Sequence, residues 1–169
     1  NEVESAFTRR DTAALERSEQ RVLRLLSDLD ELVGTREEFL LGRWLADAKR
    51  WATNDSERRL YEWNARNLIT LWGSKCTEGE NDDLNLYDYK EWQGMFSSYF
   101  RPRWEEFFLR LNQSIETNRP FDRAPFAAAM CEWEKTWSRR TDSFPVHPRG
   151  SAIDVARRLR KGYADLLSN

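Results

Sequence analysis

The chain has 169 residues, of which 40% are hydrophobic and 33% charged, enough for one globular domain with a buried core. Its 27 basic and 29 acidic side chains leave a net charge of −2, which excludes a strongly basic surface for nucleic acid or an anionic membrane. An aromatic content of 13% argues against disorder, and no run of about 18 apolar residues indicates a membrane span. We expect a single helical domain over residues 1–169. Because it begins without Met, we expect a piece of a longer protein.

Helical periodicity dominates the first half. Apolar residues recur at steps of three and four from Thr8 to Val33, and Gly34 ends this first predicted helix. Thr35 and Glu38 have the spacing of a capping box that opens a second helix. Asn54 or Asp55 caps a third, which ends before Gly73; its predicted inner face contains Leu60, Asn64, Asn67, Leu68 and Leu71.

The second half continues the helical pattern after a polar, acidic loop at 74–86. A long helix from Trp92 to Ile115 contains Pro102, which removes a backbone donor, so a kink or break is expected there. Asp122 caps a fifth helix, and a Pro-rich connector at 144–150 leads to a last helix that begins near Ser151. No segment alternates with the period of a strand. The predicted fold is all-α, an antiparallel bundle of about five or six helices.

The two cysteines allow at most one disulfide. We expect two separate thiols instead, with Cys131 buried beside Trp133 and Cys76 in a loop.

No convincing catalytic set is visible. Adjacent carboxylates on a helix point about 100° apart, so such pairs do not converge on one reacting atom as glycosidase carboxylates do. His147 lies between two prolines and reads as a turn residue. The acidic run 78–83 lacks the ligand spacing of an EF-hand loop. We predict no catalytic residue in this chain, no metal and no cofactor. The adjacent carboxylates considered are Glu37 and Glu38, Asp82 and Asp83, and Glu105 and Glu106.

The end of the third predicted helix is a better candidate for binding. A buried amide needs partners, so we read Asn64 as a structural hydrogen-bonding residue on the inner face. Arg66 has the spacing for a surface ion pair with Glu62. Trp72, just before Gly73, can project beyond the bundle beside a polar loop that carries Tyr87 and Tyr89. Aromatic faces cover the apolar faces of sugar rings, so this region suits a carbohydrate.

At these residues the chain resembles the C-terminal helical domain of glycoside hydrolase family 89, the α-N-acetylglucosaminidases. The similarity rests on motifs that keep their order and spacing from about Phe39 to Tyr163. They are Leu41-Gly42 with Trp44-Leu45, Asn64-x-Arg66 leading to Leu71-Trp72-Gly73, Tyr87 to Gly94, Tyr99-Phe100-x-Pro102-Arg103-Trp104, and Pro145-x-x-Pro148-Arg149-Gly150 with Asp154 and Ala156.

The resemblance implies a larger enzyme with a small N-terminal domain, a catalytic (β/α)₈ barrel and this helical domain. The catalytic glutamates of a retaining mechanism belong to the barrel, and the helical domain closes one side of the sugar pocket. The family's contact positions correspond to Trp72, Leu84 and Tyr87. The implied partners are the barrel and a terminal α-linked N-acetylglucosamine of a glycan, and the implied location is secreted, periplasmic or lysosomal.

Two alternatives stay open. One is a stand-alone helical module that binds carbohydrate or protein without catalysis. The other is a purely structural buttress that docks an exposed aromatic face on a neighbouring domain.

Overall fold

The computed structural model describes residues 2–73 and 88–167. This part of the chain is all-α, as predicted, and none of its helices is long and apolar enough to cross a membrane. The helices are α1 (Glu2–Thr8), α2 (Thr12–Val33), α3 (Leu41–Arg50), α4 (Asp55–Leu68), α5 (Arg101–Glu116), α6 (Arg123–Ser138), α7 (Ala152–Gly162) and α8 (Ala164–Leu167).

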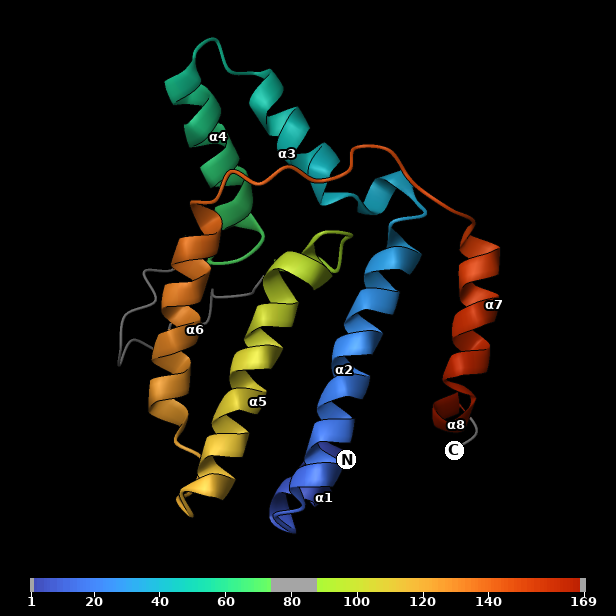
Figure 1. The fold of residues 1–169 in the computed structure, drawn as a ribbon. Coiled ribbons are helices and arrows are strands. Elements are labelled where there is room, and N and C mark those ends of the chain that lie inside the picture. The colour runs from blue at the N-terminus through green and yellow to red at the C-terminus, as the bar shows by residue number, and fades with distance from the viewer. Residues whose placement is uncertain (1, 74–87, 168–169) are drawn as a thin grey trace.

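Four long helices form an antiparallel row in the order α6, α5, α2, α7 (Figure 1). α3 and α4 form a hairpin at one end of this row, and α4 contacts α6. The connector 139–151 crosses that end of the bundle between α6 and α7, while α1 folds back on α2 at the opposite end. The C-terminal end of α4 is therefore held by α6 and by the connector.

Two apolar clusters form the core. One joins the α3–α4 hairpin to α6 and to the segment before α5, and its buried members are Leu41, Leu45, Ala65, Ile69, Met95, Tyr99 and Trp137. The other, near α1, contains Ala6, Leu15, Phe108 and Leu111. The first cluster supports the residues discussed below.

Side-chain caps define several helix starts. The side chains of Asn54, Asp122 and Ser151 accept from backbone N–H groups of Glu57, Ala124 and Asp154. The cap at Asp122 and the helix start at Ser151 were predicted, and of the two caps considered for α4 the structure has Asn54. The predicted capping box was wrong, because the hydroxyl of Thr35 donates to the Leu32 carbonyl at 2.7 Å and α3 begins only at Leu41.

The first predicted helix, Thr8 to Val33, corresponds to α2, and the short helix α1 before it was not predicted. Arg10 adopts a left-handed conformation with φ of 56°, and Asp11 caps α2 by accepting from the Ala14 N–H at 2.9 Å. The turn at Arg10 and the cap at Asp11 therefore separate α1 from α2.

A kink or break was predicted near Pro102, and the helix changes type there without breaking. A π-helical turn, Phe96–Phe100, precedes α5, and Pro102 lies in the first turn of α5, where a missing N–H costs little. Asp30 of α2 supports the approach to this turn, since its carboxylate accepts from the Gly94 N–H at 2.7 Å.

The connector passes so close to α3 that only glycine fits at residue 42. A Cβ there would lie 2.2 Å from the Pro145 carbonyl oxygen and 2.5 Å from that of Phe144. Farther along, the Arg149 N–H donates to the Gly34 carbonyl at 3.0 Å. These contacts fix the connector across the end of the bundle.

The expectation of two separate thiols was wrong. Cys131, on α6, is held in a disulfide bond, and Cys76 lies outside the described residues. Proximity in the folded chain, which the sequence does not show, decides whether two cysteines can pair.

Candidate functional site

The chain makes a tight turn after α4 and presents one large aromatic side chain there. Ile69, Thr70 and Leu71 are buried, whereas Trp72 is 37% exposed. Trp72 has φ of 50° and Gly73 φ of 83°, two successive residues in the left-handed region. A bulky residue seldom adopts this conformation, and such strain persists only where the surroundings enforce it.

Asn67 encloses this turn with its backbone and its side chain. Its carbonyl oxygen accepts from the N–H of Thr70 at 3.2 Å and from that of Trp72 at 2.7 Å. Its side-chain Oδ1 accepts from the Gly73 N–H at 2.8 Å. Three backbone donors that follow the helix are thus satisfied by one residue. Asn67 was predicted on the inner face, and its role in this turn was not predicted from the sequence; Gly73, typical of a left-handed helix end, was the available signal.

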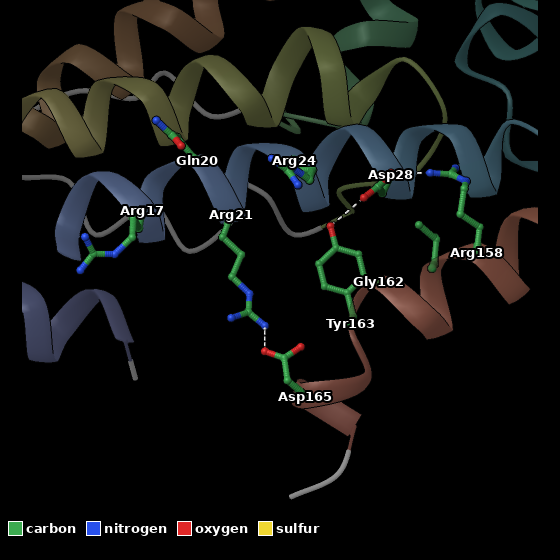
Figure 2. A pocket seen from close by; sticks show the side chains of 10 residues that line it. Arg17, Gln20, Arg21, Arg24, Asp28, Arg158, Gly162, Tyr163 and Asp165 are labelled. Atoms are coloured by element: carbon green, nitrogen blue, oxygen red, sulfur yellow. Dashed lines mark hydrogen bonds and ion pairs between the residues drawn. The ribbon is translucent and has the colours of Figure 1, made fainter. Parts of the chain in front are cut away.

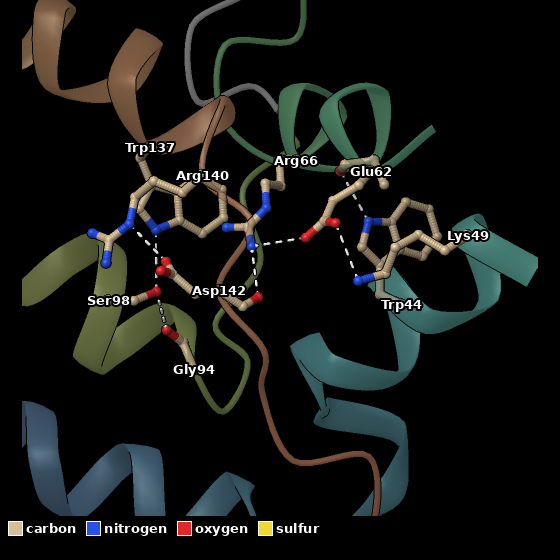
Figure 3. Close-up of polar contacts among 10 residues, drawn as sticks. Trp44, Lys49, Glu62, Arg66, Gly94, Ser98, Trp137, Arg140 and Asp142 are labelled. Atoms are coloured by element: carbon tan, nitrogen blue, oxygen red, sulfur yellow. Dashed lines mark hydrogen bonds and ion pairs between the residues drawn. The ribbon is translucent and has the colours of Figure 1, made fainter. Parts of the chain in front are cut away.

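A buried arginine lies just before the turn. Arg66 is 0% exposed, and its Nη2 donates to Glu62 at 3.1 Å and to the Asp142 carbonyl oxygen at 3.0 Å (Figure 3). Its guanidinium also lies 4.8 Å from the centre of the Trp137 ring. Burial lowers the pKa of Arg66 from its usual value, and Glu62 opposes that shift. The arginine joins α4 to α6 and to the connector.

The inner face of this helix was predicted incorrectly. Asn64 is exposed, and Leu60 and Leu68 are 49% and 47% exposed. The buried face instead contains Glu62 and Arg66, so their pairing is confirmed but is not at the surface. Two opposite charges on one helix face can be buried together as a pair, and the spacing of apolar residues does not reveal such a pair.

Arg103 also has a structural role, because it contacts two buried side chains. It forms an ion pair with buried Glu134, and its Nη1 donates to the Tyr99 hydroxyl at 3.2 Å. Burial is the main reason that the pKa of the Tyr99 hydroxyl is raised above its ordinary value, and the phenol therefore stays protonated. These contacts fasten α5 to α6.

Of the three predicted sugar contacts, only Trp72 lies in the described part of the chain. Leu84 and Tyr87 fall outside it. Tyr89, the other aromatic named beside the polar loop, is 48% exposed and contacts the Phe100 ring edge-on, with ring centres 6.1 Å apart.

Two of the adjacent carboxylate pairs considered as catalytic candidates lie within 2–73 and 88–167, and both form ion pairs with arginines. Glu37 and Glu38 pair with Arg43 and Arg36, and Glu105 and Glu106 pair one turn away with Arg101 and Arg110. His147 is exposed in the connector. Within those same ranges, no three His, Cys, Asp or Glu side chains are grouped to hold a metal ion. Asp82, Asp83 and the acidic run fall outside them.

A groove of about 520 Å³ separates α2 from α7 and α8, and ion pairs cross it (Figure 2). Arg158 reaches Asp28 and Glu31, Arg21 reaches Asp165, and the Tyr163 hydroxyl donates to Asp28 at 2.7 Å. The charges mainly attach the last two helices to α2.

A second hollow, of about 380 Å³, is aromatic. It lies between α5 and α6 and is lined by Phe100, Arg103, Trp104, Phe107 and Phe126. Trp104 is one of the exposed large apolar residues. An aromatic hollow of this kind suits a sugar ring or a neighbouring protein surface.

Comparison with known proteins decides the family. Residues 1–161 match the family described as the α-N-acetylglucosaminidase (NAGLU) C-terminal domain. The chain belongs to this family. Human α-N-acetylglucosaminidase is 32% identical to it over 161 residues, which cover 94% of this chain and 21% of the human protein.

Solved structures share the fold of this NAGLU C-terminal domain. The family 89 glycoside hydrolase from Clostridium perfringens, in complex with its substrate GlcNAc-α-1,4-galactose, aligns with a TM-score of 0.80 and 24% identity. The alignment covers 95% of this chain and 18% of the bacterial chain. The same bacterial enzyme in complex with 2-acetamido-1,2-dideoxynojirmycin aligns with a TM-score of 0.79 and 23% identity, over 96% of this chain and 19% of the other. The chain thus spans about a fifth of the length of these relatives.

Proposed function

We propose that this NAGLU C-terminal domain completes the sugar pocket of an α-N-acetylglucosaminidase-like hydrolase. The catalytic (β/α)₈ barrel of the same polypeptide hydrolyses terminal α-linked N-acetylglucosamine with retention, and this domain supplies one wall. Trp72, Leu84 and Tyr87 contact the sugar. The domain by itself does not catalyse the reaction.

The turn at Trp72 is the observation that carries this proposal. The residues before Trp72 are buried, its backbone is held in a left-handed conformation, and its indole reaches the surface. Residues that are held in a strained backbone conformation occur often at binding sites. An indole can cover the apolar face of a sugar ring.

The positions of the carboxylates support the proposal that catalysis takes place in the barrel. Retaining hydrolysis needs two carboxyl groups about 5 Å apart on either side of the sugar. The two pairs considered that lie in the described segments, Glu37–Glu38 and Glu105–Glu106, are paired with neighbouring arginines. The catalytic pair is therefore expected in the barrel.

The test is Trp72→Ala in the protein that carries this domain with its barrel. Losing the stacking face should raise KM for an aryl α-N-acetylglucosaminide about tenfold, equivalent to about 1.4 kcal/mol, with helix content unchanged. Trp51→Ala is the matched control, because Trp51 is 76% exposed at the end of α3. Equal kinetics for wild type and Trp72→Ala would remove Trp72 from the site.

The isolated domain tests the proposal that this domain neither catalyses the reaction nor forms a complete pocket by itself. It should show no turnover of the aryl substrate and at most very weak calorimetric binding of N-acetylglucosamine, because half a pocket neither excludes water nor surrounds a ligand. Turnover would overturn the division of labour, and firm binding would favour a stand-alone carbohydrate-binding module.

The aromatic hollow at Trp104 favours a second role, docking on the barrel. If Trp104→Ala lowers the melting temperature of the whole protein but not of the isolated domain, this face is the contact. Equal shifts in both would place its effect within the domain.

The disulfide at Cys131 supports the secreted, periplasmic or lysosomal location that the family resemblance implies. Disulfides persist in oxidising compartments and are rare in the cytosol.

A further inference from the structure

The left-handed turn after α4 depends on a side chain as well as on the backbone. Trp72 and Gly73 follow each other at φ of 50° and 83°. Glycine adopts this conformation readily, but tryptophan does not. Some fixed contact must therefore hold Trp72 in it.

Asn67 supplies that contact from both ends of the turn. Its carbonyl accepts from Trp72 N–H at 2.7 Å, and its Oδ1 accepts from Gly73 N–H at 2.8 Å. The two bonds hold the peptide groups on either side of the Trp72 Cα. With both peptide planes fixed, the direction of the Cα–Cβ bond of Trp72 is fixed as well.

Buried contacts hold the residues on either side of Asn67 in place. The preceding residue, Arg66, is buried and bonded to α4 and to the connector. The hydroxyl of buried Thr70 donates to the Arg66 carbonyl at 2.8 Å. Among these contacts within the described residues, the Asn67 side chain is the part that a substitution can remove, because the other bonds use backbone atoms or buried groups.

We infer that Asn67 is a positioning residue: its side-chain oxygen holds the turn that aims the Trp72 indole at the sugar. The inference rests on the proposed function, because it gives Asn67 a role only through Trp72. Without the Gly73 bond, the turn can relax to right-handed conformations, and the indole leaves its place in the pocket wall.

The experiment is a double-mutant cycle in the protein that contains the barrel, with kcat and KM measured separately on an aryl α-N-acetylglucosaminide. The variants are Asn67→Ala, Trp72→Ala and the pair. Asn67→Ala should raise KM about fivefold and leave kcat within about twofold, because it weakens binding through Trp72 without touching the reacting atoms. In the Trp72→Ala background it should change KM no further.

Two further variants separate positioning from general destabilisation. Asn67→Asp keeps an acceptor at the same position and should restore KM to near the wild-type value. Asn64→Ala is the matched control: the same residue type on the same helix, exposed and with no side-chain hydrogen bond to the described residues, so KM should not change. If Asn67→Ala does not fold, Asn67→Gln keeps the amide but moves the acceptor by one methylene, and it should raise KM in the same way.

The outcomes are distinguishable. If Trp72→Ala raises KM but Asn67→Ala and Asn67→Gln do not, the positioning role is overturned and the proposed function stands. If Asn67→Ala raises KM equally with and without Trp72, Asn67 acts by another route and the inference fails. If Trp72→Ala leaves KM unchanged, the proposed sugar contact and the inference both fail.

Discussion

The guanidinium of Arg66 donates to the backbone carbonyl of Asp142, 76 positions later in the chain, across 3.0 Å. This bond joins α4 to the connector between α6 and α7, and the same guanidinium lies over the Trp137 ring. One buried cation therefore ties together the segments that support the Trp72 turn.

Arg66→Ala should lower the free energy of unfolding by about 3 kcal/mol, because it leaves buried Glu62 without one of its two partners. Arg110→Ala is the matched control. It breaks another Arg–Glu pair one turn apart on a helix, but a more exposed one, and should cost about 0.5 kcal/mol or less. Urea unfolding measures both, and equal losses would contradict the structural role of Arg66.

Gly42→Ala and Gly162→Ala should have effects of opposite sign. At residue 42 the added methyl group meets the carbonyl oxygens of Phe144 and Pro145, which are backbone atoms, so a loss of about 3 kcal/mol is expected. At residue 162, the last position of α7, nothing lies within 4 Å of the new Cβ, and alanine should gain about 0.5 kcal/mol. Thermal melting of the two variants checks the signs. A tolerated Gly42→Ala would mean that the connector does not press on α3.

Reduction of the disulfide at Cys131 should destabilise the chain by about 2–4 kcal/mol. The measurement is urea unfolding with and without reductant, for wild type and Cys131→Ser. Reductant should shift only the wild type, down to the midpoint of the variant. A reductant effect that persists in Cys131→Ser would have another cause.

Tyr163 predicts a stability change in alkali. Burial, and next the bond to Asp28, raise the pKa of Tyr163 to about 12, while Arg24 and Arg21 oppose the shift. The unfolded phenol titrates near 10. Folding thus favours the protonated form, and its contribution is complete below about pH 10 and is lost as the pH rises to about 12. The difference in unfolding free energy between wild type and Tyr163→Phe should shrink across this window. A constant difference across this window would contradict the raised pKa of Tyr163.

Local chemistry made much of the fold predictable. Asn54, Asp122 and Ser151 cap their helices through bonds to residues two or three positions away, and Pro102 acts on its own turn. Such effects depend on short stretches of chain, so these three helix starts and the irregularity before α5 could be read directly. The motif order likewise led to the correct family.

The inner face of α4 and the clamp at Trp72 could not be read in this way. Apolar periodicity pointed to Leu60, Asn64 and Leu68, but these side chains are exposed, because α6 and the connector cover the opposite face. That face can bury Arg66 only because Glu62, a distant carbonyl oxygen and an aromatic ring meet it there. The sequence by itself determined the all-α class, the starts of the helices that have a side-chain cap at Asn54, Asp122 or Ser151, and the family that the chain resembles. The tertiary structure decided which faces are buried, because a buried charge is stable only where partners from distant segments surround it.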